Sequence, residues 1–288
     1  MTGWLHAIDI DRGHGHHDGG DCHEVDVGAD EVVVLASVFK VPLLVALHRA
    51  ADAGELRLDQ RVRITSAKRA SGAAGLGVMH DDAELSLRDL AMLMITISDN
   101  TAADVVLEQV GLDAVNETIR AVGLANTRVV ASTGDLSSAL ADDFIRSGLS
   151  ASRALADQAA LLGFRALDPD TTNYGTPRDM TTLLARIWRD EAASPAACSE
   201  MRRALRLQVF RHRLAKGFAG DGARVAGKTG TVLNVRSEIG VVGLPDGHRY
   251  AVAVFTRSDS TAPTDTAADT AIGTAARLAV EQLRRDSQ

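Results

Sequence analysis

Cysteine is scarce in this chain of 288 residues, which contains only Cys22 and Cys198. Two cysteines cannot form the disulfide framework of a small secreted domain, and a pair of unpaired thiols fits a reducing compartment. Long apolar runs are missing too, because the longest spans residues 41–47 and is far too short to cross a bilayer. The sequence therefore predicts a protein that is neither cross-linked by a disulfide framework nor inserted in a membrane.

Basic clusters are also lacking, and the net charge is -7, which argues against a nucleic-acid-binding surface. Hydrophobic residues make up 45% of the chain and charged residues 24%, which is ordinary for a globular protein. The first residues show no secretory signal, since the chain is polar again by Asp9. We expect a cytoplasmic protein from the sequence as written, or a secreted one if a leader was trimmed.

The order of the predicted elements indicates the fold class. Short alternating and apolar runs predict strands within residues 3–35, and helical spacing dominates from about 38 to 214. Strands return at 224–232, 237–243 and 249–255, and a helix follows at 266–285. We therefore expect an α+β fold (an α/β sandwich plus an all-α lobe), with an antiparallel sheet built from both chain ends and flanked by helices.

This arrangement predicts a single domain, residues 1–288, with a cleft where its two lobes meet. The sheet lobe would hold about 1–55 and 215–288, and the helical lobe about 56–214.

Local signals mark three helix boundaries. Ser86 begins a capping-box pattern, and a helix should run from Thr101 and end at Gly111. Thr176 followed by Pro177 is a third start signal, because threonine caps well and proline suits the first helical position.

Three short motifs follow one another in order along the chain: Ser37-Val38-Phe39-Lys40, Ser98-Asp99-Asn100 and Lys228-Thr229-Gly230. Each motif alone is a weak signal. Together, in this order, they resemble the active-site set of the penicillin-recognising serine hydrolases, which include class A β-lactamases and penicillin-binding proteins. The resemblance covers nearly the whole chain and implies a β-lactamase/transpeptidase-like fold and acyl transfer through a serine.

Ser37 and Lys40 carry the expected nucleophilic chemistry. They are three residues apart, so on a helix they share one face, and Pro42 places the start of that helix close to Ser37. A serine hydroxyl needs a base, and Lys40 can act as one only if burial or a second cation, such as Lys228, lowers its pKa. The alternative is that Ser37 only caps a helix and Lys40 is solvated.

The Ser98-Asp99-Asn100 motif falls between two predicted helices. The resemblance implies that Ser98 relays a proton to the leaving nitrogen, and that Asn100 holds the substrate amide and the lysine. Asn100 could instead be the N-cap of the next helix, or have both roles. We expect Asp99 to brace the turn.

The third motif continues as Lys228-Thr229-Gly230-Thr231 and should lie on an edge strand beside Ser37. Gly230 would let substrate approach the backbone. The resemblance implies an oxyanion hole made by the N–H groups of Thr231 and Ser37, and contact of Lys228 and Thr229 with a substrate carboxylate. Arg236, on the next strand, either helps to hold that carboxylate or is simply solvated.

One family feature is missing. Class A enzymes carry a deacylating glutamate in an ExxLN loop, whereas this chain has no glutamate from Thr118 through Asp190. Asp168 or Asp170 could replace that base, although an aspartate beside a proline is usually a turn former. Without a base the acyl-enzyme should persist.

A histidine-rich stretch contains seven metal-ligand side chains: His14, His16, His17, Asp18, Asp21, Cys22 and His23. Their spacing matches no closed zinc motif, so we expect no metal site and no cofactor. The partners we expect are a small-molecule β-lactam or related acyl substrate, with no nucleic acid, no membrane and a monomeric chain.

Three functional interpretations remain. The first, which the motifs favour, is a serine β-lactamase-like hydrolase that forms an acyl-Ser37 intermediate. The second is an esterase, amidase or peptidase of the same superfamily with a non-antibiotic substrate. The third is a β-lactam-binding sensor that is acylated once and does not turn over.

Overall fold

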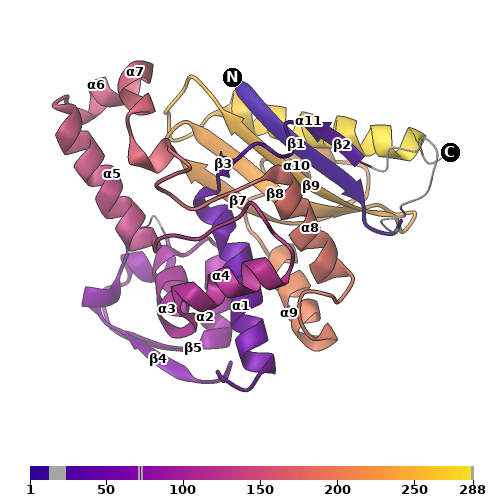
Figure 1. Ribbon diagram of the computed structural model, residues 1–288, viewed down its shortest axis with the longest axis horizontal. Helices are drawn as coiled ribbons and strands as arrows, with labels where there is room; N and C mark the ends of the chain where they lie inside the picture. Colours follow the sequence, from indigo (N-terminus) through magenta and orange to yellow (C-terminus); the bar gives the residue numbers. More distant parts are fainter. Residues whose placement is uncertain (13–23, 71, 73, 287–288) are drawn as a thin grey trace.

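A five-stranded antiparallel sheet forms the centre of the molecule. The computed structural model describes residues 1–12, 24–70, 72 and 74–286. The strand order is β2-β1-β9-β8-β7, so strands from the two ends of the chain lie side by side, as the sequence predicted (Figure 1). The bounds are β1 Thr2–Asp9, β2 Glu24–Val27, β7 Arg224–Val232, β8 Val235–Gly243 and β9 Arg249–Arg257.

Side chains alternate between the two faces along each strand, and the central strands are buried on both faces because helices cover each one. On β9, Val252 and Val254 pack with Ile272 and other residues of α11 (Thr266–Arg285) and α10 (Leu214–Gly217). Ala253 and Phe255 point to the opposite face and join the large core shared with the helical region. One continuous core therefore links the sheet to the helices that carry much of the site.

The helical region is built around α1 (Lys40–Asp52), which is buried over most of its length and packs against α2, α3, α4 and α9. Those helices are α2 Leu87–Thr96, α3 Asn100–Val110, α4 Leu112–Ala121 and α9 Pro195–Arg206. Further elements are α5 Thr133–Ser147, α6 Ala151–Ala156, α7 Gln158–Leu162 and two small sheets, β4 Arg61–Ile64 with β5 Ala83–Ser86 and β3 Val33–Val34 with β6 Tyr174–Gly175.

The predicted helix boundaries are confirmed, except that α3 begins at Asn100, one residue before the predicted Thr101. The Ser86 side chain accepts a hydrogen bond from the backbone N–H of Asp89 at the start of α2, and α3 ends at Gly111, whose φ is 85°. Thr176 caps α8 (Pro177–Trp188), and Pro177 is its first residue. Two strands are longer than predicted, since β8 begins two residues earlier and β9 ends two residues later.

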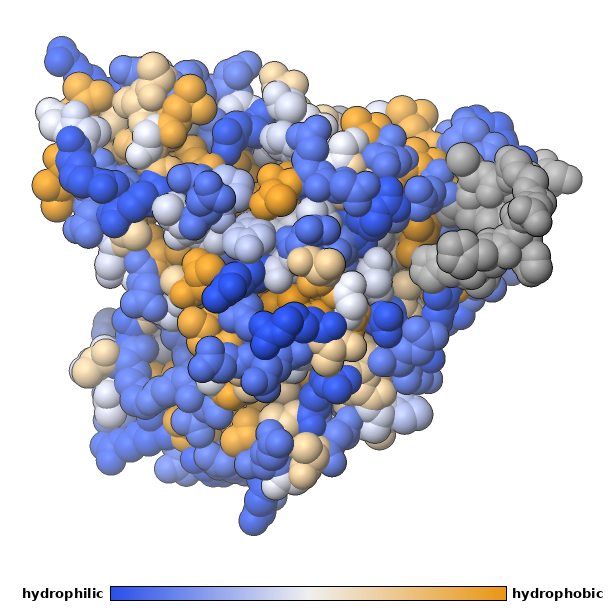
Figure 2. Space-filling model, viewed as in Figure 1, coloured by the Kyte–Doolittle hydropathy of each residue, from blue (hydrophilic) through white to orange (hydrophobic). Residues whose placement is uncertain are grey.

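Helix α8 packs against β9 and β1, although the predicted lobe boundary places it in the helical lobe. The division into one domain with those two lobes stays a prediction. Within the described ranges, no helix is both long and apolar enough to span a membrane. On the face shown in Figure 2, apolar side chains occur in small groups among hydrophilic ones.

Cys198 is buried and is not in a disulfide. Cys22, the histidines at 14, 16, 17 and 23, and the loop predicted after Arg12 lie outside the described residues.

Candidate active site

Ser37 lies on a tight turn that leads directly into α1. The turn is a 3-10 helix, η1 (Ala36–Phe39), and α1 begins at Lys40, so the predicted helix start close to Ser37 is confirmed. Ala36 has a φ of 45°, a left-handed conformation that costs a non-glycine residue about 1–3 kcal/mol. Ser37 is partly exposed and lines two cavities, so its hydroxyl is accessible to a small molecule.

Lys40 is fully buried and is held by the Ser98-Asp99-Asn100 turn. Its Nζ donates to the backbone oxygen of Ser98 at 2.7 Å, to Oδ1 of Asn100 at 2.8 Å and to Oγ of Ser98 at 3.3 Å. Burial lowers the pKa of Lys40 to about 7, against a smaller opposing effect of Asp99 and Asp104. The alternative in which Lys40 is solvated is therefore wrong, and the side chain can be neutral near neutral pH.

Lys228 also contacts Ser98. Its Nζ donates to Oγ of Ser98 at 2.9 Å and to the backbone oxygen of Thr229 at 2.7 Å. Burial, and then the charge of Lys40, hold the pKa of Lys228 well below its usual range. The sequence left burial and a second cation open as causes of a lowered Lys40 pKa, and burial is the main cause for both lysines. Ser98 Oγ thus connects two lysines whose protons are easily lost.

The Ser98-Asp99-Asn100 turn is fixed by Asp99, as predicted. One carboxylate oxygen of Asp99 accepts from the N–H of Ala102 and caps α3, and the other accepts from the N–H of Leu76 at 2.7 Å. Asn100 is the first residue of α3, so the alternative that Asn100 is the cap is wrong. Ser98 itself has a left-handed φ of 58°, which is a second strained residue at this site.

Strand β7 lies at the edge of the sheet and contacts η1, which confirms the predicted place of Lys228-Thr229-Gly230-Thr231 beside Ser37. Thr229 and Thr231 line the larger cavity. A Cβ atom on Gly230 would lie 2.5 Å from Oγ of Ser237 and 2.7 Å from the backbone oxygen of Leu35. Glycine is thus required here by internal packing, and neither cavity beside Ser37 is lined by Gly230.

A buried carboxyl group that the sequence analysis did not single out supports β7. The N–H of Thr229 donates to Oε1 of Gln208 at 2.7 Å, and Nε2 of Gln208 donates to Glu238 at 2.8 Å. The second oxygen of Glu238 accepts from the N–H of Leu214 at 2.8 Å. Burial raises the pKa of Glu238 to about 7. This chain of hydrogen bonds ties the Thr229 backbone to the start of α10.

Arg236 is buried, so the alternative of a solvated strand arginine is wrong. Its guanidinium donates to the backbone oxygens of Leu233 and Ala262, both at 2.6 Å, and lines the larger cavity.

Arg213 lines the same cavity and was missed by the sequence analysis. Its guanidinium donates to the backbone oxygen of Gly230 and to Oγ1 of Thr231, both at 2.8 Å, and to Asp269 at 2.7 Å. No local pattern could reveal it, because Arg213 lies in an irregular segment and reaches residues up to 56 positions away.

The larger cavity is a cleft of about 590 Å³ that brings the predicted residues together. Ser37, Ser98, Asn100, Thr229, Thr231 and Arg236 line it, and Lys40 and Lys228 reach Ser98 from beneath. Other lining residues include His212, Arg213, Lys216 and Asp269. Since three of the lining side chains are cationic and one is a carboxylate already paired with Arg213, the cleft suits a substrate that carries negative charge.

Comparison with known proteins places the chain in a family. A family model described as the beta-lactamase enzyme family matches residues 11–283. The chain belongs to this family. A relative named beta-lactamase regulatory protein BlaB, from Streptomyces cacaoi, is 30% identical over 277 residues, which are 91% of this chain and 89% of the relative. The extended-spectrum beta-lactamase PER-1 of Pseudomonas aeruginosa is 23% identical over 236 residues, 78% of this chain and 68% of PER-1.

Solved structures of the same family share this fold. The beta-lactamase from Sphaerobacter thermophilus has a TM-score of 0.77 at 28% identity, and the match covers 99% of this chain and 91% of the beta-lactamase chain. The structure of PBP-A has a TM-score of 0.75 at 26% identity, and the match covers 98% of this chain and 90% of PBP-A. A mutant of PBP-A has been solved as an acyl-enzyme complex with penicillin G. The α+β fold predicted from the sequence is therefore that of the beta-lactamase family.

The second cavity, of about 120 Å³, lies on another side of Ser37. Its polar lining includes the hydroxyls of Thr133, Ser137 and Thr172 and the amide of Asn100. Among the described residues, no carboxylate lines it. This side of the serine thus has polar groups that could hold a water molecule and no acidic side chain that could deprotonate it.

The two aspartates considered as replacement bases lie elsewhere. Asp168 lines a separate cavity beside Trp4, and Asp170 is exposed and donates its N–H to Asp168 at 3.0 Å. Neither belongs to the residues that line the cavities at Ser37. Their turn-forming role, the alternative left open by the sequence, agrees with this geometry.

Proposed function

We propose that this chain opens a β-lactam amide through an acyl-Ser37 intermediate and releases the acyl group slowly. The observation that carries the proposal is the hydrogen-bonded set Lys40–Ser98–Lys228 at the floor of the cleft that Ser37 lines. Lys40 supplies a base that is about half neutral at pH 7 and contacts Ser98, and Ser98 supplies a proton donor that lines the same cleft as the nucleophile.

These positions support the following acylation step. Ser37 Oγ attacks the carbonyl carbon of the β-lactam, and its proton passes to the neutral Nζ of Lys40. The N–H groups of Ser37 and Thr231 hold the oxyanion, and one such donor is worth roughly 3 kcal/mol. The C–N bond then breaks, and the nitrogen takes the proton of the Ser98 hydroxyl. Lys40, 3.3 Å from that hydroxyl, returns the proton to Ser98 while Lys228 stabilises the negative charge that develops there.

Substrate binding uses the cationic side of the cleft. Thr229, with Arg236 and Arg213 behind it, would meet the carboxylate that β-lactams carry beside the ring nitrogen. Arg236 already donates to three backbone oxygens, so it acts mainly through its charge, whereas the hydroxyl of Thr229 can donate directly. Asn100, whose Oδ1 accepts from Lys40, has an amide group that can donate to the substrate.

Deacylation is the weak step in this proposal. It needs a water molecule beside the ester and a base that deprotonates this water. Such general-base catalysis typically raises the rate by about 10²–10⁴-fold. No described carboxylate lines the small cavity at Ser37. This observation favours a second candidate function, a sensor that is acylated once, and the relative BlaB is itself named a regulatory protein.

Intact-mass measurement over time, after mixing with penicillin G, tests the proposal. We expect one acyl adduct on the wild type, no adduct on Ser37→Ala, and a normal adduct on the control Ser66→Ala, an exposed serine outside both cavities. An adduct that decays over minutes with release of product supports slow hydrolysis, and an adduct that persists for hours supports the sensor. No adduct on the wild type, together with fast turnover of a linear ester, would instead support the esterase interpretation.

A further inference from the structure

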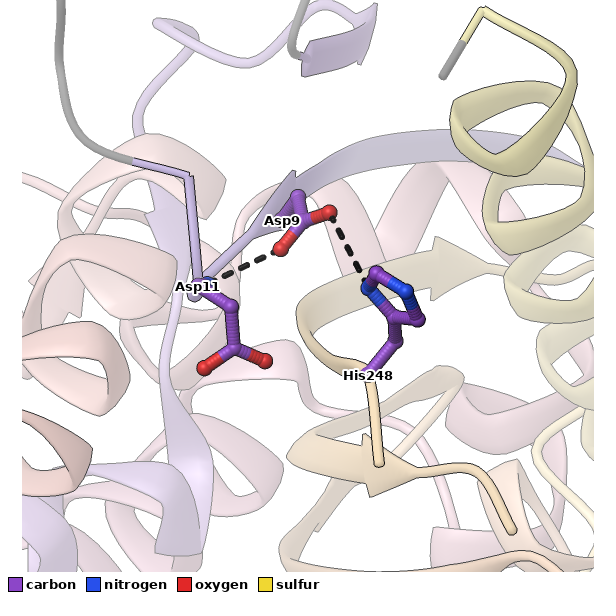
Figure 3. A group of neighbouring side chains, drawn as sticks. All are labelled: Asp9, Asp11 and His248. Carbon is purple, nitrogen blue, oxygen red and sulfur yellow. Dashed lines mark hydrogen bonds and ion pairs between the residues drawn. The ribbon is translucent and has the colours of Figure 1, made fainter. Parts of the chain in front are cut away.

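Three possible metal ligands meet at the end of β1, and none of them lines the cleft of Ser37. Asp9 is the last residue of β1, Asp11 follows two residues later, and His248 lies in the turn just before β9 (Figure 3). One ligand atom from each residue lies within 4.8 Å of the other two. The side chains thus converge from two segments that are more than 230 positions apart in the sequence but adjacent in the sheet.

Asp9 carries an unexplained buried oxygen. The residue is only 4% exposed, and its Oδ1 accepts from the N–H of Asp11 at 2.9 Å. Its Oδ2 has no hydrogen-bond partner; the nearest nitrogen atoms of basic side chains are Nε of Arg12 at 3.9 Å and Nδ1 of His248 at 4.0 Å. A buried carboxylate oxygen without a donor is costly, and an ion or a water molecule is the usual explanation.

We propose that Asp9, Asp11 and His248 bind one divalent transition-metal ion, of which Zn²⁺ is the best match. The 4.0 Å between Asp9 Oδ2 and His248 Nδ1 is too long for a hydrogen bond. Two metal–ligand bonds of about 2.0–2.2 Å each, to carboxylate oxygen and imidazole nitrogen, reach across this distance only at a wide angle at the metal, so a tetrahedral ion would draw the two side chains slightly closer together. One imidazole and two carboxylates leave a fourth position for water, and the ion would tie the end of β1 to the turn before β9.

Neighbouring arginines set a limit on the affinity. The guanidinium of Arg249 and its backbone N–H, the latter at 2.9 Å, donate to Asp11, so a metal ion would have to share the Asp11 oxygens with Arg249. Arg12 approaches the free oxygen of Asp9 and would repel a metal ion there. Removal of the Arg12 charge should therefore tighten metal binding, an effect that loss of structure cannot imitate.

Co²⁺ titration, followed by visible absorption and by displacement with Zn²⁺, tests the site. The background variant carries replacements of the histidines at 14, 16, 17 and 23 and of Cys22, so that these side chains cannot supply the signal. We expect one equivalent of Co²⁺ to bind, and at least about tenfold weaker binding in His248→Ala. The matched control His80→Ala, an exposed histidine elsewhere, should bind like the background variant.

The variant Arg12→Gln, which removes the nearby positive charge, tests the metal site even if His248→Ala or Asp9→Asn folds poorly. Arg12→Gln should bind Co²⁺ several-fold more tightly, and Zn²⁺ should raise its melting temperature more than that of the background variant. Absence of binding in both the background variant and Arg12→Gln would overturn the proposal and leave a buried water molecule as the occupant. Unchanged binding in His248→Ala would also overturn it.

Discussion

Replacement of Lys40 by arginine tests the base of the proposed reaction most directly. Burial lowers the pKa of Lys40 from an ordinary 10.5 to about 7. At pH 7 about half of the side chain would be neutral, against roughly 3 in 10⁴ for an ordinary lysine, a gain of roughly 10³-fold in available base. Arginine keeps the charge and stays protonated, so Lys40→Arg should slow acylation by about 10²–10⁴-fold.

The pH dependence of the wild type gives an independent measure. Because the neutral form of Lys40 is the active one, the acylation rate should rise with pH, pass its midpoint near 7 and level off above it. The assay is the rate of acyl-adduct formation with penicillin G, by quenched-flow mass spectrometry between pH 5.5 and 8.5. Lys68→Arg, at an exposed lysine paired with Glu108, is the control for a general effect of the substitution.

Two results would refute this reasoning. Acylation of Lys40→Arg at the wild-type rate would show that another group takes the proton of Ser37. An acylation rate that is already level at pH 5.5 would point to a carboxylate base, although no free carboxylate among the described residues lines the cleft.

Three further outcomes are expected. A chromogenic cephalosporin should give a burst of about one equivalent of product and then slow turnover, and a linear progress curve without a burst would contradict slow deacylation. Glu238 has a raised pKa in the folded state, so its contribution to stability is present at low pH and is lost as pH rises from about 4.5 to about 7. Glu238→Gln should remove this dependence, up to about 3 kcal/mol, in urea unfolding at pH 5 and 8. Arg178 forms ion pairs with Glu24, Asp26 and Asp30. Arg178→Gln should lower the free energy of unfolding in urea by about 1–2 kcal/mol, and by less in 1 M NaCl, because salt screens these pairs. A loss of stability that salt leaves unchanged would argue against ion pairing.

Features of the fold that depend on neighbouring residues could be predicted from the sequence. The start of α8 at Thr176 and Pro177 and the end of α3 at Gly111 follow from local backbone preferences. The sheet made from both chain ends followed from the order of strands and helices. The ends of β8 and β9 were missed by two residues, because pairing with a neighbouring strand, and not local composition, extends them.

Features of the site that depend on distant contacts could not be predicted in this way. The three motifs supplied Ser37, Lys40 and Lys228, and their family resemblance supplied expected roles. The support from Gln208 and Glu238 beneath Thr229 depends on contacts between residues 21 and 30 positions apart. Neither of these side chains belongs to a short motif, so only the folded structure identifies them.

In the proposed reaction, the polar groups around Ser37 are distributed unequally between acylation and deacylation. On the acylation side, burial of Lys40 and Lys228 is unfavourable for folding, and it persists because each ammonium group donates to at least two oxygens. Ala36 and Ser98 add backbone strain at the same place. On the side of the small cavity, the described lining offers hydroxyls and an amide, whose proton affinity is too low to activate water. Backbone strain and buried lysines thus occur where the proposed acylation takes place, and no described base lies where deacylation would need one. The decisive measurement is therefore the lifetime of the acyl-enzyme, because a short lifetime indicates a hydrolase and a long one a sensor.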